Sequence, residues 1–280
     1  MNKRGDSMIV SRAMELWRAS EYEIASTDFL SPAEKLEIYN ELNARIGSGM
    51  SRCFFWGGCR GAERGVTVFL PEWAAPEDMP AHRMPLDEER TDAFAAYLTA
   101  HPEVMEEIPV TALSVKGSGF RELGHRDFMG GILSLGVDRS VIGDIAVLSP
   151  SEAIVFTAKR IAPFLASEFT KIGRDAVRTE EIPISPDFIL PRRYEEMPVV
   201  VSSPRLDGVV KALCGKSRET AAEMVRAGLC ELNYSVTTDV SKELGAGDIL
   251  SVRGWGKCVI GEVTGSTKSG RLRMTCRKYV

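Results

Sequence analysis

Residues 203–233 decide the fold of the C-terminal part of the chain, and they read SPRLDGVVKALCGKSRETAAEMVRAGLCELN. Ser203 is a good N-cap, and Pro204 suits the first helical position because its missing N–H would have no partner there. Apolar residues then recur at helical spacing: Leu206, Val209, Val210 and Leu213. The pattern predicts a short helix that is capped by Ser203 and buries one apolar stripe.

A second short helix and a small sheet are predicted next. Ser217 is another N-cap, and Gly228 is placed to end the helix that Ser217 starts. Between them, Ala221, Ala222 and Val225 can pack inward. After Gly228 the helical period ends, and β-like runs follow over residues 229–233, 249–253 and 258–264.

Basic side chains gather in this part of the chain, although the protein as a whole is acidic. The 280 residues carry a net charge of −4. Residues 199–280 hold 13 Lys and Arg against 8 Asp and Glu, a balance of +5, and the remainder holds 22 against 31, a balance of −9. A basic module on an acidic body is typical of a protein that meets nucleic acid at one end. We expect RNA contacts from Arg205, Lys211, Lys216, Ser217, Arg218, Arg226, Asn233, Arg253 and Lys257.

The order of motifs in this module resembles the S4-type RNA-binding domain. The motifs are Arg-Leu-Asp at 205–207, Ser-Arg at 217–218, Gly228 followed by Asn233, and Gly-Asp-Ile at 247–249. The resemblance implies a compact domain of two helices and a small sheet that holds structured RNA. Ser217 and Asn233 would be polar anchors beside the cations, and recognition would be mainly of RNA shape.

The N-terminal region predicts a mixed α/β fold. Helical spacing predicts a helix over residues 6–23. The capping box Ser31-Pro32-Ala33-Glu34 starts a second helix. Further along come strands over 53–56 and 66–70, a proline-rich loop over 71–85 and a helix over 87–100.

The middle of the chain predicts a βαββαβ layer, the order of ferredoxin-like and RRM-like domains. Its elements are a strand over 110–115, a helix over 125–135, strands over 142–148 and 153–156, a helix over 159–169 and a strand over 176–184. Pro163 fits only near the first turn of its helix. The central strands lack an obvious pair of exposed aromatic residues, so the sequence assigns no base stacking to this sheet.

Several strings in the first two thirds of the chain resemble the YlmH family of bacterial proteins. They are Thr-Asp-Phe-Leu-Ser-Pro at 27–32, Leu-Gly-His-Arg-Asp-Phe-Met-Gly-Gly at 123–131, Leu-Gly-Val-Asp-Arg at 135–139 and Ile-Gly-Asp-Ile at 142–145. The family usually has Thr-His-Arg-Asp, and a bulkier residue at the second glycine, where this chain has Gly124 and Gly131.

The resemblance implies a non-enzymatic RNA-binding protein with an α/β N-terminal part, an RRM-like middle and a C-terminal S4-type domain. It also implies binding to the large ribosomal subunit near ribosomal and transfer RNA, a role with stalled translation products and a link to cell division. Candidates for additional RNA contacts are His125, Arg126, Arg139 and Trp255. Phe120 and Tyr279 are further candidates for stacking on bases.

An RNA-modifying enzyme is the alternative hypothesis, and an adaptor whose acidic body binds a protein is a third. The string Arg-Leu-Asp at 205–207 is similar to the catalytic motif of pseudouridine synthases, which often carry an S4-type domain. Here Gly208 follows, in place of their Thr-Ser-Gly-like stretch, so Asp207 is expected to act within its own domain. His125-Arg126-Asp127 does not indicate a kinase, because Ile132 stands where the magnesium-binding Asn is needed.

We therefore expect an α+β multidomain protein. The predicted parts are a mixed α/β domain over 1–108, an RRM-like or ferredoxin-like domain over 109–186, a linker over 187–198 and an S4-type domain over 199–280. Six scattered cysteines without a C-x-x-C pair favour reduced thiols in a cytoplasmic protein. No membrane segment, metal, cofactor or small-molecule substrate is expected.

Overall fold

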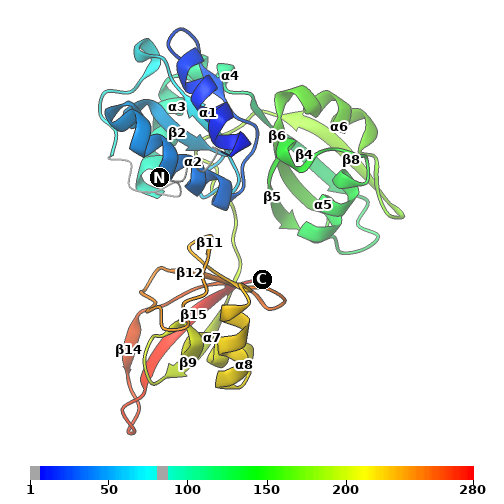
Figure 1. Ribbon diagram of the computed structural model, residues 1–280. Coiled ribbons are helices and arrows are strands. Elements are labelled where there is room, and N and C mark those ends of the chain that lie inside the picture. The colour runs from blue at the N-terminus through cyan, green and yellow to red at the C-terminus, as the bar shows by residue number, and fades with distance from the viewer. Residues whose placement is uncertain (1–6, 81–87) are drawn as a thin grey trace. The chain divides into compact units, whose positions relative to one another are not determined.

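The computed structural model describes residues 7–80 and 88–280, and within them the chain is a mixed α/β protein with eight α-helices and three β-sheets. It forms two compact units, Met1–Pro191 and Arg192–Val280 (Figure 1). Three predicted boundaries lie outside the described residues: the start of the helix over 6–23 at Asp6, the end of the proline-rich loop at Pro85 and the start of the helix over 87–100 at Asp87. In the described part of the chain, no helix is both long and apolar enough to cross a membrane.

The first unit begins with helices packed beside a small sheet. The predicted capping box is confirmed, because the Ser31 Oγ accepts from the Glu34 N–H at 3.3 Å and the Glu34 carboxylate accepts from the Ser31 N–H at 2.6 Å. The three-stranded sheet has the order β1-β3-β2. Its elements are α1 (Met8–Ala19), β1 (Ala25–Ser26), α2 (Pro32–Ile46), η1 (Gly47–Arg52), β2 (Cys53–Trp56), β3 (Val66–Phe69), η2 (Glu72–Ala74), α3 (Glu88–Ala100) and α4 (Pro102–Glu107).

A five-stranded antiparallel sheet follows in the same unit, with the order β5-β6-β4-β8-β7. Pro163 lies in the first turn of its helix, where its missing N–H costs no intrahelical hydrogen bond. The Gly131 backbone packs so closely on Phe169 that a Cβ would lie 2.8 Å from its ring, which explains why no bulkier residue stands there. The elements are β4 (Val110–Gly117), α5 (His125–Leu133), η3 (Arg139–Val141), β5 (Ile142–Ser149), β6 (Glu152–Ala158), η4 (Lys159–Ile161), α6 (Ala162–Glu168), β7 (Lys171–Ile172) and β8 (Asp175–Ile182).

The largest hydrophobic core of this unit runs through both sheets, and a smaller separate cluster packs α1 and α2 against β2 and β3. The N-terminal region contacts the five-stranded sheet around Phe156 of β6. A Cβ added to Gly58 would lie 2.5 Å from the Phe156 ring, and one added to Gly143 would lie 2.5 Å from the Phe29 ring and 3.1 Å from the Phe156 Cβ. The Phe188 ring also packs near Phe156, with 6.1 Å between the two ring centroids. The N-terminal region and residues 188–190 therefore cover part of the five-stranded sheet.

A polar junction fixes the same two parts to each other. The Asp144 carboxylate accepts from the backbone N–H groups of Glu63 and Arg64, at 2.6 and 3.1 Å. The Arg64 guanidinium donates to the carbonyls of Phe29, Arg139 and Ile142 at 3.0–3.2 Å. Asp144 lies in the string at 142–145 and Arg139 in the string at 135–139, both of which resemble the YlmH family. These strings thus supply contacts that hold the first unit together.

The second unit starts inside the predicted linker, which corrects that expectation. β9 (Tyr194–Val201) pairs along its whole length with β15 (Leu272–Tyr279). Pro198 is tolerated because β9 is an edge strand, where a missing N–H costs no ladder bond. The remaining elements are α7 (Leu206–Cys214), α8 (Arg218–Arg226), β10 (Cys230–Leu232), β11 (Ser235–Val236), β12 (Ile249–Val252), β13 (Gly256–Val259) and β14 (Val263–Ser266).

The seven strands of the second unit form one antiparallel sheet with α7 and α8 on one face (Figure 1). Met274 and Cys276 of β15 are buried with Val209 and Val225 of the helices, so this face holds the core. The alternate residues of β15, such as Arg277 and Tyr279, belong to the opposite, helix-free face. The predicted third strand over 258–264 is instead split into β13 and β14.

Gly261 causes this split and offers a test of the sheet. A Cβ at Gly261 would lie 1.8 Å from the Thr275 carbonyl oxygen, so only glycine lets the chain pass this close to β15 between β13 and β14. Gly261→Ala should destabilise the second unit by at least about 1–3 kcal/mol, because backbone atoms must move. Urea unfolding of the full chain, followed by NMR signals of the second unit, measures this.

The matched control is Gly208→Ala, where the added Cβ meets nothing closer than 3.6 Å and stands inside α7. That change should be neutral or stabilising by up to about 1 kcal/mol. Equal losses in the two variants would contradict the close approach at Gly261.

Candidate nucleic-acid interface

Helix α7 starts at Leu206, so the prediction that Ser203 caps it is wrong. Pro204 and Arg205 are extended and pair with residues 242–244: the Leu244 N–H donates to the Pro204 carbonyl at 2.9 Å. The first helical N–H groups then donate to loop carbonyls, Leu206 to Lys242 at 2.8 Å and Asp207 to Val240 at 3.2 Å. A distant loop therefore performs the capping that the sequence assigned to a serine.

Asp207 joins two of the predicted RNA-binding arginines. Its carboxylate is buried and accepts from Arg218 Nε at 3.0 Å and from Arg205 Nε at 3.4 Å. Burial alone would raise the pKa of Asp207, but the hydrogen bonds and charge of Arg218, with help from the Gly208 N–H and Arg205, outweigh burial and hold the pKa below its usual value. The two guanidinium groups are thus held over one anchored carboxylate, with the Arg218 side chain 65% exposed.

Helix α8 begins as predicted. The Ser217 Oγ accepts from the Thr220 N–H at 3.0 Å, so Ser217 is a helix cap whose acceptor is already engaged. Lys211, Lys216 and Arg226 are exposed around the ends of the two helices. Together with Arg205 and Arg218 they form a set of five cations on the helical layer, which we call the helix-side cations.

Asn233 has a structural role in a turn. Its backbone φ is 48°, and its side chain donates to Asp248 Oδ1 at 2.9 Å and accepts from the Ile249 N–H at 2.9 Å. Asparagine tolerates this left-handed conformation better than most residues. The structure therefore places Asn233 inside the strand connection, away from the role of polar anchor that the sequence predicted.

The remaining predicted residues of the module lie apart from the helix-side cations. Lys257 belongs to the helix-free face, where its Nζ lies 4.4 Å from the centroid of the Tyr279 ring. Arg253 is exposed in the β12–β13 turn, and Trp255 beside it is half-buried. Lys278 was missed by the sequence analysis: its Nζ lies 4.7 Å from the Trp255 ring centroid. Only the pairing of β15 with β13, a long-range contact, brings Lys278 to that ring.

The candidate RNA contacts in the region of the five-stranded sheet also differ in how exposed they are. Arg139 is half-buried, donates to the carbonyls of Ile142 and Gly143 at 2.7 and 3.3 Å, and burial lowers its pKa to about 10. His125 and Arg126 are exposed at the first turn of α5, and desolvation by neighbouring atoms lowers the pKa of His125. Asp127 caps the start of α5 as predicted, because its carboxylate accepts from the Gly124 N–H at 2.9 Å and places a negative charge at the positive end of the helix dipole.

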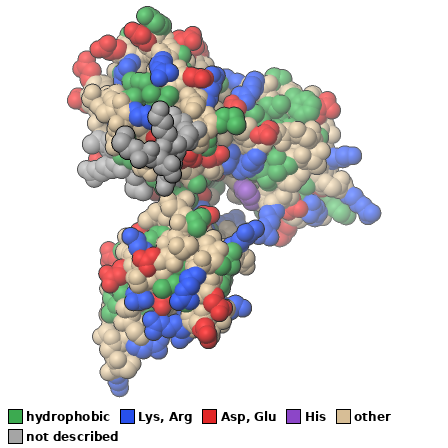
Figure 2. Space-filling model, in the orientation of Figure 1, with side chains coloured by type: hydrophobic (Ala, Val, Ile, Leu, Met, Phe, Trp, Pro, Cys, Tyr) green, Lys and Arg blue, Asp and Glu red, His purple; other side chains and the backbone are tan. Residues whose placement is uncertain are grey.

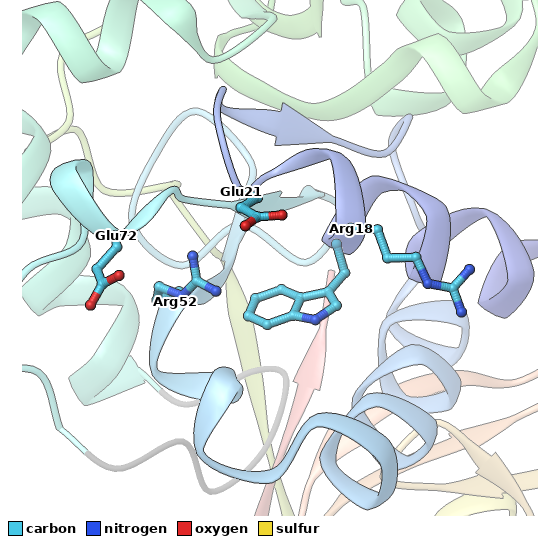
Figure 3. A pocket seen from close by; sticks show the side chains of 5 residues that line it. Arg18, Glu21, Arg52 and Glu72 are labelled. Carbon is cyan, nitrogen blue, oxygen red and sulfur yellow. The ribbon is translucent and has the colours of Figure 1, made fainter.

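A hollow of about 370 Å³ lies in the N-terminal region beside Trp17. Figure 3 shows Arg52 near Glu21 and Glu72, with Arg18 on the other side of the indole. The Arg52 guanidinium stacks on the indole, 4.6 Å from its centroid, and donates to the Leu70 carbonyl at 3.2 Å. Two arginines and two glutamates cancel in charge, so this hollow is poorly suited to a phosphate backbone. Among residues 7–80 and 88–280, no three His, Cys, Asp or Glu side chains group as metal ligands.

Comparisons with known proteins agree with the family strings. Residues 105–186, which span the five-stranded sheet, match the family model described as "Putative RNA-binding domain in YlmH". The chain is 27% identical over 275 residues to the ribosome-associated protein quality control protein P2 of Bacillus subtilis (strain 168), covering 98% of this chain and 95% of that protein. The chain is thus similar to the YlmH family, over residues 105–186 by the family model and over nearly its whole length by the Bacillus subtilis relative. The solved structure of the cell division protein ylmH from Streptococcus pneumoniae matches with a TM-score of 0.43 and 18% identity, over 65% of this chain and 96% of that one.

The anchor at Asp207 gives a pH-dependent prediction for the second unit. Because the folded-state pKa is lowered, the charged carboxylate stabilises the fold above the ordinary aspartate value of 3.8, and this contribution is lost as pH falls through the folded-state pKa. Asp207→Asn should therefore reduce the unfolding free energy at pH 7 by about 1–3 kcal/mol. The difference from wild type should shrink below pH 3.8.

Urea titrations of the full-length wild type and variant at several pH values measure this, with NMR signals of the second unit as the probe. Asp239→Asn is the control, because Asp239 is exposed and its carboxylate accepts from the Ser241 N–H and hydroxyl, so its loss should cost much less than that of a buried anchor. A difference for Asp207→Asn that stays constant down to the lowest pH would contradict a charged anchor.

Proposed function

We propose that this protein is a ribosome-associated, RNA-binding factor that acts by binding in the cytoplasm. Two findings support the proposal. The match over residues 105–186 is to a domain described as RNA-binding, and the Bacillus subtilis relative, which aligns over nearly the whole chain, is named for ribosome-associated quality control. We further propose that the large subunit, with ribosomal or transfer RNA, supplies the bound RNA.

The second unit is proposed to be the S4-type module, with the helix-side cations contacting phosphates. Two short helices on one face of a small sheet, with five cations around the helix ends, support this assignment. Figure 2 shows Lys and Arg side chains over this unit with acidic ones among them, so the local placement of cations matters more than net charge. Lys216 and Arg226 make no side-chain hydrogen bond or ion pair among the described residues, which leaves both groups available to phosphates.

The first unit is proposed to contain an RRM-like layer. Its strand order β5-β6-β4-β8 and the helices α5 and α6 follow the βαββαβ pattern of that class.

The pseudouridine synthase alternative is disfavoured by the surroundings of Asp207. A catalytic aspartate must reach a nucleobase, whereas Asp207 is 4% exposed and already accepts from Arg205, Gly208 and Arg218. Its carboxylate is committed to holding the module together. This observation favours binding over base modification at the Arg-Leu-Asp string.

The helix-side cations can be tested without disturbing the Asp207 anchor. Substituting Arg205 and Arg218 would leave a buried carboxylate without its charged partners, so loss of binding could reflect loss of folding. Lys216→Gln with Arg226→Gln removes two cations that make no such contact. We expect weaker RNA binding across sequences and a slope of log affinity against log salt that is smaller by about 2.

Binding of the full chain to a labelled RNA stem-loop, titrated at several salt concentrations, measures this. Lys268→Gln with Arg273→Gln is the matched control, since both are exposed in or near the β14–β15 hairpin and remove the same charge. Equal slopes for the two double variants would mean that total charge, and not the helical layer, governs binding. Sedimentation of lysates tests the ribosome: wild type at the top of the gradient would overturn the proposed association.

A further inference from the structure

The five-stranded sheet of the first unit presents a problem for RNA binding. RRM domains stack bases on aromatic residues of the sheet face that their helices leave open. Here Phe29, the turn at Gly58 and Phe188 pack against Phe156 on the sheet. The Phe188 carbonyl also accepts from the Arg60 N–H at 2.9 Å, which fastens that cover in place. The aromatic side chain of a central strand is thus part of the core, at 1% exposure.

An exposed aromatic residue lies instead at the edge of this sheet. Phe120 is 82% exposed and sits in the loop 118–124 between β4 and α5, which we call the Phe120 loop. Figure 1 shows this loop next to the β7–β8 hairpin, and the Ser118 N–H donates to the Ala176 carbonyl of that hairpin at 3.0 Å. The ring is therefore presented to solvent beside a second turn of the chain.

The Phe120 loop is anchored from below. The Ser118 Oγ donates to Asp175, which is 1% exposed, and accepts from the Phe120 N–H at 3.3 Å. The other oxygen of Asp175, Oδ2, is buried and has no hydrogen-bond partner among residues 7–80 and 88–280. At the far end of the loop, the Leu123 N–H donates to the Pro150 carbonyl at 2.6 Å. A loop held at both ends loses little further conformational freedom when a ligand binds.

Several cations lie on the elements that flank the Phe120 loop. Arg126 is exposed in the first turn of α5, and Lys171 and Arg174 are exposed in the β7–β8 hairpin. None of these three side chains makes a hydrogen bond or ion pair with another described residue. Arg121 approaches the hairpin, its Nη2 being 4.0 Å from where a Gly173 Cβ would stand, and it pairs with Asp127 at 3.0 Å. A solvent-exposed ring on a loop that is flanked by elements carrying cations matches an unpaired nucleotide, whose base can stack on the ring while its phosphates contact the cations.

We propose that the Phe120 loop and the β7–β8 hairpin form a second RNA-binding site, which takes an unpaired nucleotide of a loop or bulge. The Phe120 ring stacks on the base, and Arg126, Lys171 and Arg174 contact the flanking phosphates. This inference rests on the proposed RNA-binding function and locates it within the first unit. Under this inference, single-stranded RNA binds at the Phe120 loop and the β7–β8 hairpin, and double-helical RNA binds at the helix-side cations.

The test compares two RNA probes with the full-length protein: a stem closed by an unpaired loop, and the same stem as a blunt duplex. Phe120→Ala should weaken binding of the looped probe by about 5- to 100-fold and leave duplex binding unchanged. Phe120→Tyr should keep the wild-type affinity because its ring still stacks. Phe164→Ala is the control, since Phe164 is also exposed, at 41%, but lies on α6 away from the loop.

The possible outcomes separate this inference from the proposed function. Unchanged affinity of Phe120→Ala for the looped probe, with wild type binding both probes, would overturn the site alone. Equal weakening by Phe164→Ala would also overturn it, because general surface apolarity would then explain the effect. Wild type that binds neither probe would overturn both proposals. Melting curves of each variant check that the exposed substitutions leave the fold intact.

Discussion

The buried carboxylate of Asp207 is the interaction on which the basic surface of the second unit depends. It draws Arg205, at the start of α7, and Arg218, at the start of α8, to one point. Without it, two positive groups would repel each other where two helices meet. The ion pair is therefore both a link between the helices and a device that fixes the direction of two cations. Its partly exposed arginines keep some capacity to contact a phosphate while remaining anchored.

In the first unit the corresponding constraint is the cover on the five-stranded sheet. Arg64 and Asp144 bind backbone groups across the junction, and Phe29 fills the space that Gly143 leaves. These contacts turn two predicted domains into one compact unit. They also occupy the surface that would most readily stack bases, which is why we propose RNA contact at the sheet edge. Stability of the junction and location of the second site are thus consequences of the same packing.

Local signals in the sequence predicted local structure well. The Ser31 capping box, the Ser217 cap and the stop at Gly228 depend on residues within one helical turn, and all are confirmed. The predicted strands and helices of the middle region are present as β4, α5, β5, β6, α6 and β8, but the two-residue strand β7 makes a fifth strand that the sequence analysis did not predict. β9 was missed, since Pro198 argues against a strand until the partner β15 makes it an edge.

The candidate site was less predictable, because its residues are assigned by distant contacts. The Ser203 cap failed when a loop much further along the chain supplied the carbonyls for α7. Asn233 and Arg139 looked available in the sequence, yet a turn and a junction use their polar groups. Composition predicted a basic module but could not say which of its cations had internal partners.

The most direct test of the account is crosslinking of RNA to the wild-type protein on isolated ribosomes, with the crosslinked residues identified by mass spectrometry. Crosslinks should fall on the peptides that hold the helix-side cations of α7 and α8, with a second group on the Phe120 loop. Crosslinks confined to the helix-free face of the second unit, or to the acidic N-terminal region around α1 and α2, would contradict it.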